Sequence, residues 1–386
     1  MTSDRWSDDA FLDVLAGHKD DLADQTVARL IEDHGIQKVG YIFQKMSASD
    51  DQIPADAPRA LLDFVEQTLA LPPDIDHERL GRRDALLPFG PVSVLIMLAA
   101  SLPHGYAAPR LARILTISDD LATHPYKRLM GVVQLLINLG DRGAFVPGGR
   151  AVVTAQKMRL LHAGVRLLVP RYRPEYEKQF GVPVNFEDQL ATLMGFSYLV
   201  IDGLRRLHCI TREQDAEDRY YRWHVFARLM GIHPPGKPED GTWVPGDVAS
   251  AARFYGSYAR RHFAAAGENP DGVKLARANL DMLVDMIPRW LRFGHGLMPR
   301  IAMAELMDPE DLARIGLSPV AGHRFLKGLF TVGLHTSYGI WRALPVGLEH
   351  ALGYLVYQGM VRFGRGGKVQ FVIPTSVDTL RGEGFV

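Results

Sequence analysis

The stretch KMRLLHAGVR, residues 157–166, places one histidine between two arginines near the middle of a 386-residue chain. It lies in the segment 154–169, where apolar residues recur at spacings of three and four, a pattern typical of an amphipathic helix. The apolar stripe of this helix, which we expect to face the core, consists of Met158, Leu161, Val165 and Leu168. At about 100° per residue, His162, Arg166 and Arg159 share an arc of roughly 60° just beside that stripe.

This arrangement suits a flat, mostly apolar cofactor that carries carboxylates at one edge. The imidazole of His162 would bind a central metal, and the guanidinium groups of Arg159 and Arg166 would pair with the carboxylates. The alternative is a core histidine on a helix whose cationic side faces water. Spacing alone favours this alternative, because a lone histidine on a helix is usually an ordinary core or boundary residue.

The composition is that of a globular protein with a sizeable core, since 47% of the residues are hydrophobic and 23% are charged. Lys and Arg together number 44, as do Asp and Glu, so there is no electrostatic reason to expect nucleic acid as a partner. The single cysteine, Cys209, excludes an internal disulfide, a multi-cysteine metal cluster and covalent c-type haem attachment.

The start of the chain, MTSDRWSDDAFLD, is acidic and polar, unlike a secretory signal, and we therefore expect a cytoplasmic location. The least polar stretch, 85–102, is interrupted by Pro88 and Pro91 and followed by Pro103. Its continuous apolar part, 92–102, is about half as long as a membrane-spanning helix. We expect a buried helix there and no membrane span.

Helical periodicity dominates the chain, and clear alternation is confined to one strand candidate, KVQFVIP at 368–374. Helices are expected at 22–43, 59–71, 92–102, 110–117, 127–139, 154–169, 187–207, 217–231, 248–265, 274–293 and 348–362. The sequence therefore predicts one all-α domain. We expect a haem-binding core at 81–300, a helical extension at 1–80 and a second extension at 301–386.

Several catalytic motifs are absent from the sequence. There is no G-x-G-x-x-G, no G-x-x-x-x-G-K-[ST] and no E-x-x-H, so nucleotide cradles and helical di-iron sites lack support. DDLAD, residues 20–24, has the spacing of a magnesium-diphosphate motif. We interpret it as the acidic first turn of the 22–43 helix, where negative charge favours the helix dipole.

The segment GVPVNFEDQLATLMGFSYLVIDGLRRL, residues 181–207, follows the histidine helix after a short turn. Together with KMRLLHAGVR it resembles the latex-clearing protein, or rubber oxygenase, family, whose relatives include membrane-bound oxygenases of fungal meroterpenoid pathways. Further similarity lies in ASLPHGYAAPRL (100–111), HPYKRLMGV (124–132) and PGGRAVVTAQKMRLLHAGVR (147–166). The resemblance covers roughly 80–235.

The resemblance implies a globin-like helical core around a non-covalent b-type haem. It makes His162 the proximal iron ligand, and Arg159 and Arg166 haem-side arginines. It also makes Arg128 a catalytic, distal-side or haem-contacting arginine, and it aligns Arg292 with a further haem-side arginine. Secreted members of the family use dioxygen to cleave the double bonds of polyisoprene.

The sequence departs from the family on the distal side. Rubber-cleaving members carry a Lys-Thr pair where this chain has Gly131 and Val132, and Lys127 points about 100° away from Arg128. The aligned segment 108–115 offers no carboxylate to replace the distal acidic residue of the family. We therefore expect a resting iron that is five-coordinate or water-ligated.

These features predict a haem-dependent oxidoreductase, dioxygenase- or peroxygenase-like, that uses dioxygen or peroxide. Its substrate is expected to be a hydrophobic small molecule, terpenoid or lipid-like, and oxidative C=C cleavage is the reaction that the family suggests. Met130, Met158 and Met194 are candidates to line the pocket, although ordinary core packing is the favoured interpretation for each of them. Two alternatives remain open: a haem-binding or sensor protein without turnover, and a cofactor-free helical lipid-binding protein.

Overall fold

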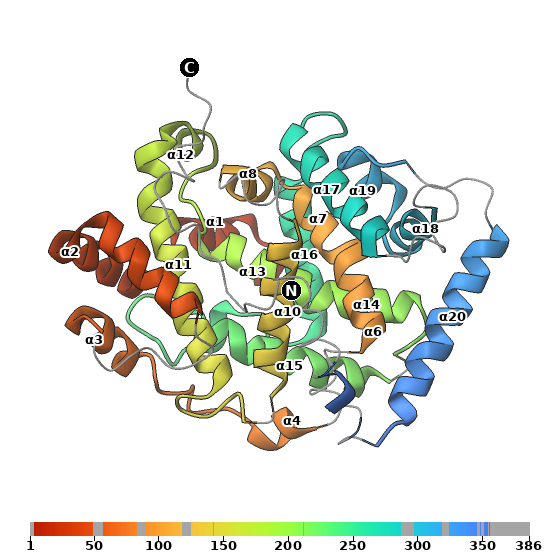
Figure 1. Ribbon diagram of the computed structural model, residues 1–386, viewed down its shortest axis with the longest axis horizontal. Helices are drawn as coiled ribbons and strands as arrows, with labels where there is room; N and C mark the ends of the chain where they lie inside the picture. The colour runs from red at the N-terminus through yellow and green to blue at the C-terminus, as the bar shows by residue number, and fades with distance from the viewer. Residues whose placement is uncertain are drawn as a thin grey trace.

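Layers of helices make up the computed structural model, as Figure 1 shows. The structure describes residues 4–48, 57–82, 90–117, 125–141, 143–210, 212–286, 297–318, 324–345, 348, 351–353 and 355. Within these ranges there is no β-strand, so the predicted all-α class is confirmed. The strand predicted at 368–374 lies outside the described residues.

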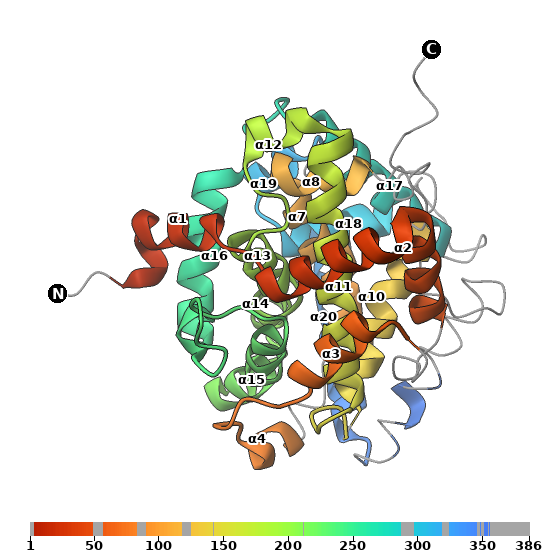
Figure 2. The ribbon, with the colours of Figure 1, turned by 90° about the vertical axis from the view of Figure 1, so that its left-hand side faces the viewer.

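Helix α11, Arg150–Tyr172, contains the KMRLLHAGVR stretch and lies in the left half of the view in Figure 1. It contacts α2 (Asp21–Ala48), α10 (Pro125–Gly140), α12 (Pro174–Phe180) and α15 (Glu213–Leu229). Figure 2 shows α2 lying across α11. The residue before α11 is Gly149, and a Cβ there would lie 2.5 Å from the backbone oxygen of Ala144. The tight turn before the helix therefore has no room for a side chain.

The single helix predicted at 187–207 is two helices, α13 (Phe186–Phe196) and α14 (Tyr198–Arg206). The break falls at Ser197, whose hydroxyl donates to the backbone oxygen of Leu193 at 2.7 Å. Such side-chain bonding to the preceding turn competes with helix continuation. At the other end of α13, the Asn185 side chain caps the helix by accepting from the Asp188 amide at 2.9 Å.

The apolar segment at 92–102 forms α6 (Pro91–Ile96), a π-helical turn (Met97–Ser101) and α7 (Leu102–Tyr106), followed by α8 (Pro109–Ile117). All five residues of the π-helical turn are buried, as expected for a core helix. No helix in the described part alone has the length and apolar composition to cross a membrane. The bent pair 92–106 and 109–117 meets that criterion together, with 101° between its arms.

The remaining described helices surround these elements. They are η1 (Arg5–Ser7), α1 (Asp9–Gly17), α3 (Arg59–Gln67), α4 (His77–Gly81), η3 (Gly241–Trp243), α16 (Val248–His262), α17 (Pro270–Met286), α18 (Leu297–Leu306), α19 (Pro309–Arg314) and α20 (Arg324–Ala343). The sequence analysis missed α20, which lies at the edge of the molecule (Figure 1). The division into a core at 81–300 with extensions at 1–80 and 301–386 stays a prediction.

The buried apolar side chains form three clusters that share α11. Ala151, Val152 and Ala155, near its start, belong to the main cluster. Leu160 and Ala163 belong to a second cluster with α2 and α3, and Val169 to a third with α8 and α12. Helix α11 therefore joins parts of the core that are otherwise separate.

Candidate functional site

His162 lies in the middle of α11 with a half-buried side chain. Burial, together with the positive charge of Arg166, lowers the pKa of His162 to about 4, so the imidazole is neutral near pH 7. Its Nδ1 lies 3.3 Å from Oε1 of Gln189, a buried residue of α13. A neutral imidazole is the form of histidine that binds a metal.

The second hydrogen bond of Gln189 shows which ring nitrogen of His162 carries the proton. The Gln189 amide Nε2 donates to the backbone oxygen of Val184 at 3.1 Å, so Oε1 is the end of the amide that faces His162. An amide oxygen accepts hydrogen bonds and cannot donate them. The proton of the neutral ring therefore lies on Nδ1, and Nε2 keeps a lone pair. No hydrogen bond to this Nε2 occurs within the described ranges.

Arg159 and Arg166 are buried, and both pair with carboxylates of the protein itself. Arg159 donates from Nε and Nη2 to the two oxygens of Asp20, at 2.6 and 3.0 Å. Arg166 donates from Nε to Oδ1 of Asp24 at 2.7 Å. Burial alone would raise the pKa of Asp20, but the Arg159 charge and hydrogen bonds hold it below its usual range. The two arginines thus fasten α11 to the start of α2.

The apolar stripe predicted to face the core is the more open side of α11. Its four members, Met158, Leu161, Val165 and Leu168, are half-buried, whereas Arg159 and Arg166 are buried. All four pack against the buried apolar clusters, as predicted, but the sequence did not predict that the arginine face would be buried more deeply. Two aspartates from α2 neutralise the charged face, and this allows it to be buried. His162 lies on the half-buried side of α11.

The distal-side candidates are only partly described. Arg128 belongs to α10, which contacts α11, but its side chain lies outside the described residues, as does that of Met130. Gly131 and Val132 follow on α10 and are both half-buried, and Val132 packs against the main cluster. Arg292 lies outside the described residues. Its role and that of Arg128 stay predictions.

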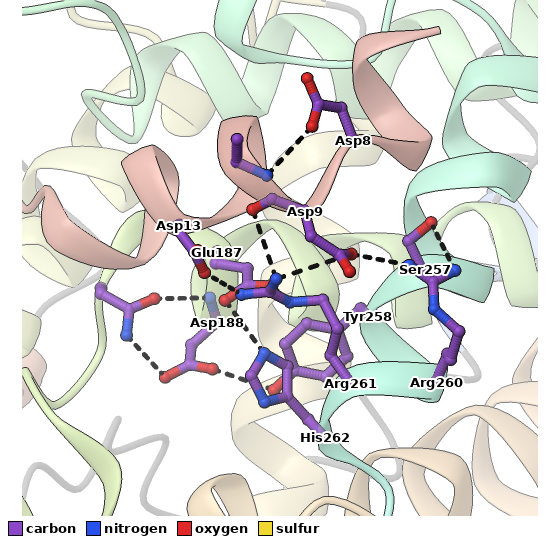
Figure 3. A network of polar contacts seen from close by, with 12 residues as sticks. Asp8, Asp9, Asp13, Glu187, Asp188, Ser257, Tyr258, Arg260, Arg261 and His262 are labelled. Atoms are coloured by element: carbon purple, nitrogen blue, oxygen red, sulfur yellow. Dashed lines mark hydrogen bonds and ion pairs between the residues drawn. The ribbon is translucent and has the colours of Figure 1, made fainter. Parts of the chain in front are cut away.

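Helix α13 is anchored by a buried charge network next to Gln189, seen in Figure 3. Asp188 accepts from the Tyr258 hydroxyl at 2.9 Å and lies 3.0 Å from Nε of Arg110. Glu187 lies 3.0 Å from Nε2 of His262 and 3.2 Å from Nε of Arg261. Burial raises the pKa of Asp188 despite the charge of Arg110. These contacts fix α13 against α16 and so hold Gln189 in place.

Sequence reasoning missed three residues of this site: Asp20, Asp24 and Gln189. The DDLAD motif marked the two aspartates, and their partners in α11 are 139 and 142 positions away. Gln189 follows directly after Glu187 and Asp188 in the segment that carries the family resemblance. Nothing in its own spacing pointed to His162.

A protein metal cluster is not apparent in the part of the chain that the structure describes. No group of three or more histidine, cysteine, aspartate or glutamate side chains is placed there to hold a metal ion. His104, the other histidine with a pKa lowered to about 4, is buried beside the rings of Tyr255 and Phe263. Among the described residues, His162 therefore has no histidine, cysteine or carboxylate side chains arranged with it as a metal-binding group of three or more.

Comparison with known proteins agrees with the fold and with the segments that carry the resemblance. Rubber oxygenase of Streptomyces sp. (strain K30) is 27% identical over 237 residues, which cover 60% of this chain. The chain spans little more than half, 56%, of the length of that relative. The solved structure of latex clearing protein LCP in the closed state has a TM-score of 0.64 at 20% identity, and the match covers 91% of each chain. At that identity the structural match establishes the fold alone.

Residues 80–335 match the family model for the ER-bound oxygenase mpaB/B'/rubber oxygenase catalytic domain. This range includes α11, α13 and every arginine proposed for the site. Since the match extends over more than half of the sequence, the chain belongs to this oxygenase family.

Proposed function

We propose that this chain is a haem b-dependent oxygenase that acts on a hydrophobic small molecule, with His162 as the iron ligand. The observation that carries the proposal is the neutral imidazole of His162, whose Nδ1 is held by Gln189. Histidine that binds a metal usually donates its other ring N–H to such an acceptor, which fixes the tautomer and the orientation of the ring. One histidine commonly holds haem iron.

The surroundings of His162 fit a flat, apolar group better than a bare metal ion. The half-buried stripe of α11 offers apolar side chains beside the imidazole, namely Met158, Leu161 and Val165. The carboxylates of a haem need donors, but Nε and Nη2 of Arg159 already serve Asp20 and Nε of Arg166 serves Asp24. Arg166 Nη2 is buried with no hydrogen-bond partner among the described residues, and it remains available to a carboxylate. Arg128 and Arg292 are the other proposed partners.

A bound haem supplies the chemistry that activates dioxygen or peroxide. The protein contributes a fixed imidazole, an apolar surface that excludes water, and arginine charge near the reacting centre. An apolar surface selects a substrate such as a terpenoid or a lipid-like molecule, because burial of apolar area drives its binding. Oxidative cleavage of a C=C bond is the reaction proposed by analogy with the family, and Arg128 is its proposed catalytic residue.

The absorption spectrum of the purified protein, with and without reductant, tests the cofactor. We expect an intense Soret band that is lost or strongly shifted in His162→Ala. His104→Gln is the matched control, because it replaces another buried histidine with a lowered pKa on a different helix. A colourless wild type with no affinity for added haem would refute the proposal and leave a helical lipid-binding protein as the better interpretation.

A haem-binding or sensor protein without turnover is a second candidate. Gly131 and Val132 favour it, because they replace the Lys-Thr pair of rubber-cleaving relatives and provide neither an amine nor a hydroxyl. Oxygen consumption separates the two candidates. The oxygenase consumes dioxygen when terpenoid or unsaturated fatty-acyl compounds are added, with oxidised products detectable by mass spectrometry. A sensor binds haem and ligands but forms no product.

A further inference from the structure

We infer that Asp24 and Gln189 are positioning residues for the His162 imidazole, joined to it through Arg166 and the backbone carbonyl of Val184. The inference rests on the proposed function, in which His162 holds the iron. It assigns a role to the start of α2, a helix that precedes the region matched by the family model. Asp24 does not touch the imidazole and acts through the groups between them.

The first link is the hydrogen bond between His162 Nδ1 and Gln189 Oε1, at 3.3 Å. A primary amide has a donor end and an acceptor end, and its rotation by 180° would turn a donor toward Nδ1. The ring proton would then move to Nε2, the nitrogen that has to bind iron. The orientation of the Gln189 amide thus decides whether Nε2 is available.

The second link is the carbonyl of Val184, which decides that orientation. It accepts from Gln189 Nε2 and from Arg166 Nη1, both at 3.1 Å. Val184 has a φ of +52°, a left-handed conformation that is strained for a β-branched residue. A strained residue that is kept in place by two donors indicates that the direction of its carbonyl matters.

The third link is the ion pair between Arg166 and Asp24. The Arg166 Nε donates to Asp24 Oδ1 at 2.7 Å, and both side chains are at least 90% buried. The other oxygen of Asp24 accepts from Lys19 Nζ at 2.7 Å. Lys19 and Arg166 therefore both hold the Asp24 carboxylate in place. The carboxylate in turn fixes the orientation of the Arg166 guanidinium, whose Nη1 donates to the Val184 carbonyl.

Asp20 provides an internal contrast. Its pair with Arg159 joins the same two helices and is also at least 90% buried. Arg159 makes no hydrogen bond to Val184 or Gln189 within the described ranges; its guanidinium lies over the Phe64 ring, 5.3 Å from the ring centre. A purely structural role predicts equal effects for the two aspartates. The charge of Asp20 raises the pKa of His162 without a hydrogen bond on the path from Asp24 to the ring, so the inference predicts a change of tautomer for Asp24 alone.

The test compares five variants with the wild type: Asp24→Asn, Gln189→Leu, Gln189→Glu, Asp20→Asn and Asp21→Asn. Asp20→Asn is matched for loss of a buried ion pair, and Asp21→Asn changes an exposed neighbour in the same motif. The primary readout is the tautomer of His162, read from its ¹⁵N imidazole resonances in haem-free protein. Haem affinity and the reduction potential of the haem-loaded protein are the second and third.

We expect the wild type, Asp20→Asn and Asp21→Asn to keep the proton on Nδ1. Asp24→Asn and Gln189→Leu should give mixed tautomers and about 10-fold or greater loss of haem affinity, the range seen when the groups that orient metal ligands are removed. Gln189→Glu keeps an acceptor at Nδ1 and should rescue the tautomer. Its carboxylate makes the imidazole a stronger donor, so the reduction potential should fall relative to the wild type.

Equal tautomer changes in Asp20→Asn and Asp24→Asn would show that both aspartates only hold α2 against α11, and would overturn the inference. An unchanged tautomer in Gln189→Leu would overturn it as well. Gln189→Leu keeps both ion pairs, so it still decides the question if an aspartate variant does not fold. A wild type that binds no haem would refute the proposed function, whereas the haem-free tautomer would still test the inference.

Discussion

Arg159 and Asp20 form a two-pronged ion pair across the α2–α11 boundary, with N···O distances of 2.6 and 3.0 Å. Both side chains are buried, so the pair keeps its Coulomb attraction only by giving up the hydration of both groups. Such a pair contributes little against an apolar replacement of both partners, but the loss of one partner strands a buried charge. The stability of the α2–α11 contact therefore depends on keeping the two residues together.

Replacement of Asp20 alone is accordingly expected to be costly. Asp20→Ala leaves the guanidinium of Arg159 buried without its carboxylate, and the free energy of unfolding should fall by about 3–5 kcal/mol. The double variant Asp20→Leu/Arg159→Met should regain most of that loss, because no unpaired charge remains. Urea unfolding of the single and double variants measures both effects. A double variant as unstable as Asp20→Ala would contradict this account.

This pair also marks the limit of what the sequence could predict. The all-α class and most helices follow from local periodicity, because a helix depends on residues three and four positions apart. Periodicity placed His162 beside an apolar stripe but could not find the partners of Arg159 and Arg166, which are about 140 positions away. Without those partners, the deep burial of Arg159 and Arg166 could not be predicted. Ser197, with φ of −109° and ψ of −76°, likewise divides a predicted helix into two.

Gly231 tests how closely Arg159 is enclosed. It has a φ of +79°, and a Cβ there would lie 2.8 Å from Cζ of Arg159. Gly236 has a similar φ of +70° with open space around it. Gly236→Ala should therefore cost about 1–2 kcal/mol from the backbone alone, and Gly231→Ala a further 1–3 kcal/mol from crowding. Denaturant unfolding compares them, and equal losses would show that Arg159 moves aside freely.

His104 should make the stability of the protein depend on pH. Burial, and then the positive charge of Arg206, lowers the pKa of His104 to about 4 from 6.5. Below pH 6.5 the unfolded chain binds a proton at this site and the folded protein does not, so its stability falls as the pH drops toward 4. The difference corresponds to about 3 kcal/mol at full effect.

His104→Gln removes this linkage and should flatten the decline in stability between pH 6.5 and 4. Unfolding free energies at several pH values, in wild type and variant, measure the change in slope. The imidazole Nδ1 of His104 makes no hydrogen bond among the described residues and lies 3.8 Å from Oδ2 of Asp311. The other oxygen of Asp311 lies 3.6 Å from Nε of Arg314, so glutamine leaves that carboxylate with a cation beside it. Identical slopes in the two proteins would show that His104 already binds its proton in the folded state.

Gly131 offers a test of the distal side. It lies on α10, which contacts α11, and the family resemblance aligns it with a lysine of rubber-cleaving members. The wild type, lacking that amine, should give the ferric spectrum of a five-coordinate or water-ligated haem. If α10 covers the haem face opposite His162, the lysine amine of Gly131→Lys should bind the iron there. The spectrum would then become that of a low-spin, six-coordinate iron. Val132→Thr is the matched control, because it changes the neighbouring half-buried position without adding a strong ligand. The same high-spin spectrum in all three proteins would place α10 away from the iron, and the distal residue would then have to be sought on another helix.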